Sequence, residues 1–218
     1  MSQLKLIRGR VSAGCLCVAL ISPIIAHAAP LIPVDEAVKQ PDFFTFRAQL
    51  QTAVAKHDKA AVLAVVSKNI QNTFGGDNGS ENFKKLWAMD KPNSKLWEEL
   101  GVVLALGGSF QNDGSFEAPY VSANWPDVDG FENIAIIGNK VNVRKAPQLD
   151  GEVLQTLSYE VVPLDTKDHG NDQWVAIKLP NGKKGYVSRS YTRSSVDYRA
   201  FFAKVDGRWQ MTTFVAGD

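Results

Sequence analysis

The first half of the chain places apolar residues with the period of an α-helix. From Phe43 to Lys68 they recur at steps of three and four residues, at Phe46, Leu50, Val54, Val62, Val65 and Val66. The charged run 56–59 interrupts this pattern and predicts a bend between two helices, with Asp58 as the N-cap of the second. A short strand is expected at 69–74, followed by a turn in the glycine-rich run 75–79.

A second helical region is expected after this turn. Ser80 is the predicted N-cap, and Phe83, Leu86 and Trp87 would form the apolar face. The helical pattern restarts after Pro92, with apolar residues at Leu96, Leu100, Val103 and Leu104. The pair Gly107-Gly108 should end this helix.

Beyond Ser109 the pattern changes to short β-rich runs. Residues 116–125 are expected to form a strand, 126–130 a linker, and 134–192 a series of short strands. Asp206-Gly207 separates two further β-rich runs, and such a pair supplies the positive φ of a tight hairpin turn. This hairpin is apolar on both faces, which favours packing against the N-terminal helices with the intervening strands inserted. A simple extension of the β-rich unit is the alternative.

Residues 1–28 have the pattern of a secretory signal peptide. Three basic residues precede an apolar run from Val11 to Ile25, and Ala26-His27-Ala28 has the small-x-small form of a cleavage site. The apolar run is shorter than the ~20 residues that span a bilayer, and Pro23 interrupts it. We therefore expect a mature chain that begins at Ala29, is periplasmic or secreted, and has no stable membrane insertion.

Cleavage would change both the charge and the cysteine content. The chain has 24 basic and 23 acidic residues, and removal of three basic ones leaves 21, a net charge near −2. Such a balance gives no long-range attraction to nucleic acid, so no nucleic-acid partner is expected. Both cysteines, Cys15 and Cys17, precede Ala29, so the mature chain must be held by its core rather than by disulfides.

A series of motifs orders the β-rich half of the chain. They are Val141-Asn-Val-Arg144, Gly151–Leu157, Trp174–Ile177 and Asn181–Val187. Their order and spacing resemble a bacterial SH3 domain over about 60 residues, which is the size of a small domain. The resemblance implies a binding module with five strands, at 141–144, 151–157, 159–164, 174–179 and 185–187. Lys145 and Tyr186 depart from the family pattern, which usually has Gly or Ser and Trp there.

Four residues are the candidate ligand-binding set. Trp174 combines wide apolar faces with an indole N–H and suits the floor of a groove, with Tyr186 nearby. Arg144 could pair with a ligand carboxylate. Tyr191 falls where the resemblance implies an aromatic that closes the barrel. The alternative to ligand binding is a structural role for these residues. In that case Trp174 and Tyr186 would cap the barrel core, and Arg144 would brace its own loop.

The helical region and the C-terminal hairpin resemble the nuclear transport factor 2-like fold. This resemblance implies helices over a curved sheet, often with a conical pocket, and some relatives are enzymes. The mature chain has only His57 and His169, with no Cys/His cluster at metal-ligand spacing and no phosphate loop or nucleophile elbow. We therefore assign no catalytic residue, metal or cofactor, and expect a surface role for His57.

The sequence predicts an α+β protein of several parts. A signal peptide (1–28) and a Pro-rich leader (29–42) precede an N-terminal α+β domain (43–130), a small all-β SH3-like barrel (131–193) and a hairpin (194–218) that packs on the N-terminal domain. The expected function is non-catalytic binding of a cell-wall peptide or an envelope protein. The alternative is an enzyme or small-molecule binder with a pocket in the N-terminal domain.

Overall fold

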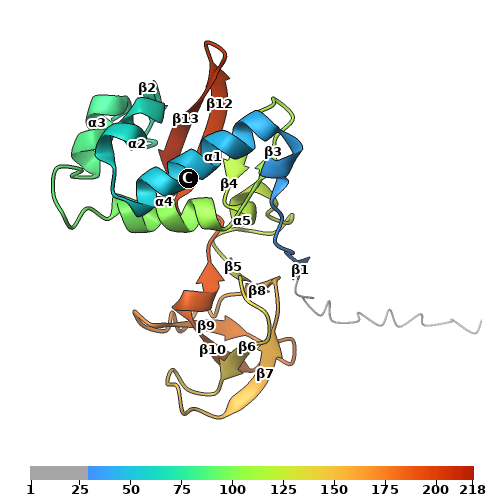
Figure 1. The fold of residues 1–218 in the computed structure, drawn as a ribbon. Coiled ribbons are helices and arrows are strands. Elements are labelled where there is room, and N and C mark those ends of the chain that lie inside the picture. Colours follow the sequence, from blue (N-terminus) through green and yellow to red (C-terminus); the bar gives the residue numbers. More distant parts are fainter. Residues whose placement is uncertain (1–28) are drawn as a thin grey trace, which may run out of the picture.

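The computed structural model describes residues 29–218, and the signal-peptide prediction concerns residues outside this range. The fold is α+β: helices cover one sheet, and a separate small barrel lies beside them (Figure 1). The chain builds most of the helical part first, then the barrel, and then returns to the helical part with its last two strands.

The helices follow the apolar pattern, with shifts at their ends. They are η1 (Glu36–Lys39), α1 (Pro41–Ala55), α2 (Lys59–Val65), α3 (Ser80–Leu86), α4 (Leu96–Ala105) and α5 (Tyr120–Ala123). Asp58 caps α2 as expected, accepting a hydrogen bond from the N–H of Ala61 at 3.0 Å. The prediction for Ser80 was wrong, because Gly79 is the N-cap of α3 and no side chain caps it. Leu86 is exposed rather than part of the apolar face.

A five-stranded sheet lies under these helices, in the order β2-β13-β12-β4-β3. Its strands are β2 (Val66–Gln71), β3 (Ser109–Phe110), β4 (Phe116–Ala118), β12 (Arg199–Val205) and β13 (Arg208–Val215). The C-terminal hairpin thus lies within this sheet, where β13 pairs parallel with β2 and β12 pairs antiparallel with β4. The strand expected at 116–125 ends at Ala118, because Pro119 has no N–H to continue a ladder, and α5 follows.

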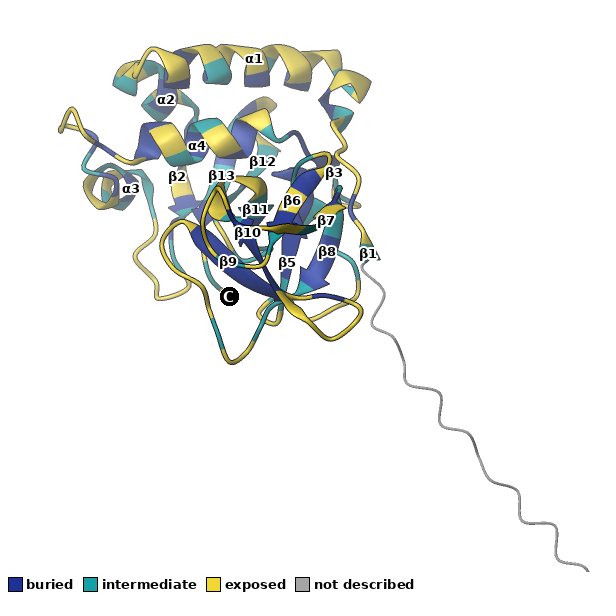
Figure 2. Ribbon diagram, turned by 90° about the horizontal axis from the view of Figure 1, so that it is seen from below, coloured by how far each residue is buried: buried dark blue, intermediate teal, exposed yellow. Residues whose placement is uncertain are grey.

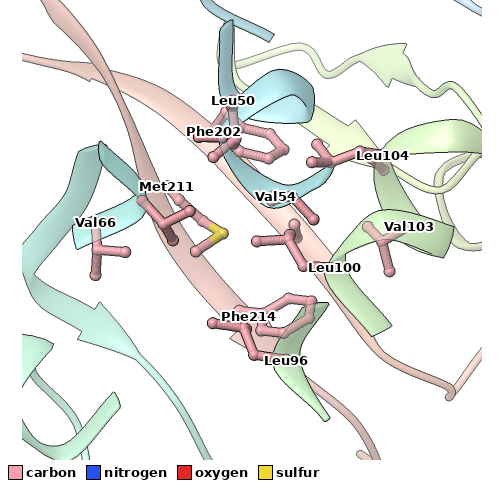
Figure 3. Packing of buried hydrophobic residues seen from close by; sticks show 14 of the residues in the cluster. Leu50, Val54, Val66, Leu96, Leu100, Val103, Leu104, Phe202, Met211 and Phe214 are labelled. Carbon is pink, nitrogen blue, oxygen red and sulfur yellow. The ribbon is translucent and has the colours of Figure 1, made fainter. Parts of the chain in front are cut away.

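The core of this part lies between the sheet and helices α1 and α4. Leu50 and Val54 of α1 and Leu96, Leu100 and Leu104 of α4 face Phe202, Met211 and Phe214 of the hairpin (Figure 3). Phe43 adds aromatic packing, with ring centroids 4.3 Å from Phe116 and 4.8 Å from Trp209. Aromatic side chains therefore fill the space between the helices and the sheet.

The barrel consists of two four-stranded sheets, β1-β8-β5-β11 and β7-β6-β10-β9. Its strands are β5 (Asn133–Ile136), β6 (Val141–Arg144), β7 (Val153–Leu157), β8 (Glu160–Pro163), β9 (Trp174–Lys178), β10 (Lys184–Ser188) and β11 (Thr192–Arg193), with η2 (Arg189–Tyr191) before the last. Alternate residues such as Val141, Val143, Val175 and Ile177 point inward and form a separate core.

The Pro-rich leader packs on both parts of the protein. β1 (Ala29–Pro30) pairs with β8 of the barrel, and the buried Leu31 donates its N–H to the carbonyl of Tyr159 at 2.8 Å. Asp35 then accepts two hydrogen bonds, of 2.7 and 2.6 Å, from the buried guanidinium of Arg47 on α1. A buried arginine needs such a partner, which fixes the leader to the helical part.

Two glycines allow the leader and β4 to approach the end of α4. Gly107 has φ of 68°, and a Cβ there would lie 2.6 Å from the carbonyl oxygen of Val34. A Cβ on Gly108 would lie 2.1 Å from the carbonyl oxygen of Glu117. Side chains at these positions would force the backbones apart, so the pair does more than end the helix.

Candidate ligand-binding site on the barrel

The outer face of strands β6, β10 and β9 carries most of the candidate residues. Tyr186 of β10 pairs in register with Arg144 of β6 and with Ala176 of β9. Two residues further along, Ser188 lies opposite Trp174. Because side chains alternate between the two faces of a strand, these residues all point to the same side of the sheet.

A cavity of about 280 Å³ opens at one end of this face. Three of the four predicted residues, Arg144, Trp174 and Tyr191, line it together. The other lining residues are Asn139, Lys140, Val141, Asn142, Leu149 and Ser188. Tyr186 lies next to Arg144 on the sheet but does not line the cavity.

Trp174 is both a packing residue and part of the cavity wall. Its side chain is only 5 % exposed and packs with Ala176 and Tyr186 in a small cluster. Its backbone N–H donates to the side-chain oxygen of Asn171 at 3.0 Å, which fixes the start of β9. Most of the indole surface is therefore covered by the barrel, and little of it is open to the cavity.

Tyr186 holds a loop of the barrel rather than facing the cavity. Its hydroxyl donates to Asp168 at 2.6 Å, and the ammonium of Lys184 donates to the same carboxylate oxygen at 2.7 Å. The pKa of Asp168 lies well below its usual value, because its carboxylate accepts hydrogen bonds. The largest effect comes from Lys184, followed by the hydroxyl of Tyr186 and the N–H of Gly170. This cluster orders the loop between β8 and β9.

Arg144 braces its own loop and also contributes to the cavity. Its guanidinium donates to the carbonyl of Gly151 at 2.8 Å, across the loop that joins β6 to β7. The exposed side chain of Leu149 sits on that loop and forms another part of the cavity wall. The structure therefore shows Arg144 bracing its own loop, and its pairing with a ligand carboxylate stays a prediction.

Tyr191 does not close the barrel, contrary to the expectation from the resemblance. It lies on η2, and its side chain is 52 % exposed. The ring borders Gly138, where a Cβ would be 3.3 Å from its Cδ1 atom. The carbonyl of Tyr191 accepts the N–H of Ile137 at 2.9 Å, so the backbone is fixed while the ring is available to solvent.

Sequence reasoning missed the loop side of the cavity. Asn139 and Lys140 lie in the turn before β6, where Lys140 has φ of 52° and donates its N–H to the hydroxyl of Ser158 at 2.7 Å. The outward position of Asn142 follows from the alternation of β6. Leu149 had no pattern to single it out, because its role depends on where the loop folds.

The histidines and the buried acidic group lie apart from this cavity. His57 is exposed and stacks on Trp97, with ring centroids 4.9 Å apart and an interplanar angle of 8°. His169 is exposed in the loop between β8 and β9. Glu117 of β4 is buried, and this burial raises the pKa of its carboxyl against the opposing effects of Ser122 and Arg199. Within residues 29–218 no group of three or more metal-ligating side chains is present.

Comparison with known families agrees with this geometry. Residues 139–193 match the family described as bacterial SH3 domain. The match covers the candidate cavity and the strands around it, and it covers less than half of the chain. The sequence of this part of the protein therefore matches a bacterial SH3 domain.

The other comparisons add no second family. Neither a search of curated proteins nor a search of solved structures found a match. The resemblance of the remaining part to the nuclear transport factor 2-like fold is not supported. Among the helices of residues 29–218, none is long and apolar enough to span a membrane.

Proposed function

We propose that this protein is an exported binding protein whose barrel contacts a cell-wall peptide or an envelope protein. The observation that carries the proposal is the convergence of Arg144, Trp174 and Tyr191 on one cavity within the bacterial SH3 domain. The signal-peptide pattern of residues 1–28 supports a periplasmic or secreted location.

The chemistry of the cavity suits a short peptide. Tyr191 and Leu149 offer exposed apolar surface, while Asn139, Asn142 and Ser188 can exchange hydrogen bonds with peptide groups. Lys140 is exposed and supplies a positive charge for a peptide carboxylate. The mixture of a few apolar anchors and convergent polar groups is typical of ligand sites.

The alternative, a small-molecule or catalytic pocket in the N-terminal domain, has less support. The space between helices and sheet is occupied by Phe43, Phe116, Phe202 and Trp209. A cavity of about 490 Å³ lies between α1 and α4, outside this packed core. Glu117 has the raised pKa of a candidate acid, but it lines neither the cavity between α1 and α4 nor the barrel cavity. We therefore retain non-catalytic binding as the proposed function.

Tyr191→Ala is the sharpest test of the site. Because the ring is half exposed, its loss should leave the melting temperature nearly unchanged. Loss of an interface aromatic should weaken binding by about 2 kcal/mol, or roughly thirtyfold. Binding of residues 29–218 to purified peptidoglycan sacculi and to its soluble stem peptides, measured by co-sedimentation and by calorimetry, checks this.

Phe74→Ala provides the matched control. Phe74 has the same exposed fraction as Tyr191, 52 %, and belongs to the N-terminal domain. The control should bind like the parent protein. Equal binding by the parent and Tyr191→Ala would refute the proposed site, and failure of the parent to bind sacculi, stem peptides or an envelope extract would refute the proposed function.

A further inference from the structure

The part of the cavity wall formed by Asn139 and Lys140 is held by a hydroxyl from another turn. Ser158, in the turn between β7 and β8, accepts the N–H of Lys140 at 2.7 Å and donates to the side-chain oxygen of Asn139 at 3.0 Å. The next residue, Tyr159, donates its N–H to the carbonyl of Gly138 at 3.2 Å. Three hydrogen bonds thus join the turn that lines the cavity to the turn between β7 and β8.

Both turns contain a residue in a backbone conformation that costs energy. Lys140 has φ of 52° and Tyr159 has φ of 51°, in the left-handed region that residues with a Cβ rarely adopt. Such a conformation persists only where the surrounding contacts hold it. The two turns support each other, so any further contact that holds Tyr159 also bears on the shape of the cavity.

The leader supplies such a contact from outside the barrel. The carbonyl of Tyr159 accepts the N–H of Leu31 at 2.8 Å, and β1 pairs with the residues of β8 that follow. Figure 2 shows β1 beside β8, at the edge of this sheet of the barrel. The side chain of Leu31 is only 3 % exposed and belongs to a buried cluster with Val161 of β8 and Val121 of α5. The leader is therefore fixed directly next to the strained turn.

The other end of the leader is anchored to the helical part. The carbonyl of Val34 accepts the N–H of Gly108 at 3.0 Å, directly after α4. The carboxylate of Asp35 accepts the two hydrogen bonds from the buried Arg47 of α1. Because the leader is bound at both ends, it connects the helical part to the turn that supports the cavity.

We propose that the leader is a positioning segment of the barrel site. Held by the helical part, it keeps Tyr159 in place and thereby keeps Asn139 and Lys140 in the wall of the cavity. The leader itself does not line the cavity, so its effect passes through the two turns. The physical basis is a continuous path of hydrogen bonds, from Leu31 to Tyr159 and from Tyr159 to Gly138. This role rests on the proposed function of the cavity.

Amide hydrogen exchange of residues 29–218, with no ligand present, tests the positioning. The parent is compared with Leu31→Ala, which loses the packing of the leader, and with a chain of residues 32–218, which also loses the hydrogen bond to Tyr159. In the shorter chain the Lys140 amide should exchange at least about tenfold faster, because the turn that accepts it is less well held. Leu31→Ala should change it in the same direction. The amides of β10, which pairs with both β6 and β9, should exchange as in the parent.

Binding to purified peptidoglycan sacculi gives the functional readout. If the turn that lines the cavity keeps its conformation in only about a tenth of the shorter chains, their apparent affinity should fall about tenfold. Ile32→Ala is the matched control, since Ile32 belongs to the leader and is 61 % exposed. This control should exchange and bind like the parent.

Three results would overturn the inference. The first is unchanged exchange at Lys140 in the shorter chain. The second is an equal increase in exchange throughout the barrel, because the leader would then stabilise the barrel as a whole. The third is faster exchange at Lys140 together with the full binding affinity of the parent. The exchange measurement uses no ligand, so it decides the positioning by itself, and a failure of the parent to bind would count against the proposed function alone.

Discussion

Phe202→Ala tests whether the C-terminal hairpin completes the N-terminal core. Phe202 is fully buried, and its ring centroid lies 5.8 Å from that of Phe43 and 5.9 Å from that of Phe46. Truncation of a buried phenylalanine costs about 3–5 kcal/mol, and each aromatic pair adds about 0.5–1.5 kcal/mol beyond burial. We therefore expect the free energy of unfolding to fall by about 4 kcal/mol.

The neighbouring residue is the control for this change. Phe201 lies on the opposite face of β12 and is only partly buried, so Phe201→Ala should cost about 1 kcal/mol. Urea unfolding followed by tryptophan fluorescence measures both, because Trp87, Trp97 and Trp209 all belong to the N-terminal core. A loss below about 1.5 kcal/mol for Phe202→Ala, or equal losses for both variants, would show that this hairpin is not the centre of that core.

Two further predictions concern the barrel and the buried acid. Trp174→Ala should lower the stability of the barrel by about 3 kcal/mol, because the indole is packed with Ala176 and Tyr186. Thermal unfolding monitored on the amide signals of β9 checks this. An unchanged melting temperature would contradict it. Burial raises the pKa of Glu117 above its unfolded value of 4.5, so the stability that its neutral form contributes is present below about pH 4.5 and is lost as the pH rises through the folded pKa. Glu117→Gln should therefore raise the melting temperature at about pH 7 and change it little at about pH 4. If the melting temperatures of the variant and the parent differed equally at both pH values, Glu117 would not ionise in a buried site.

Local patterns predicted those elements whose signals lie within a few residues of one another. The helical spacing of apolar residues placed α1, α2 and α4, and Asp58 capped α2 because an N-cap needs only its own turn. The five strands implied by the bacterial SH3 resemblance all occur, with ends shifted by up to two residues. The Asp206-Gly207 turn likewise formed the hairpin.

Other features depended on contacts between segments distant in the chain. The prolines of the leader gave no indication of its contacts. In the structure Arg47 of α1 binds Asp35, and Leu31 is buried between the helical part and the barrel. Tyr191 was expected to close the barrel, but its side chain is half exposed and lines the cavity, as does Leu149 from a loop some forty positions earlier. No periodicity in the sequence predicts that two such distant residues line one cavity, because their positions depend on how the loops pack on a closed barrel. The sequence determined which residues could build a binding module, and the tertiary structure decided which of them remain exposed to bind, since burial in the packed core removes an aromatic side chain from the surface available to a ligand.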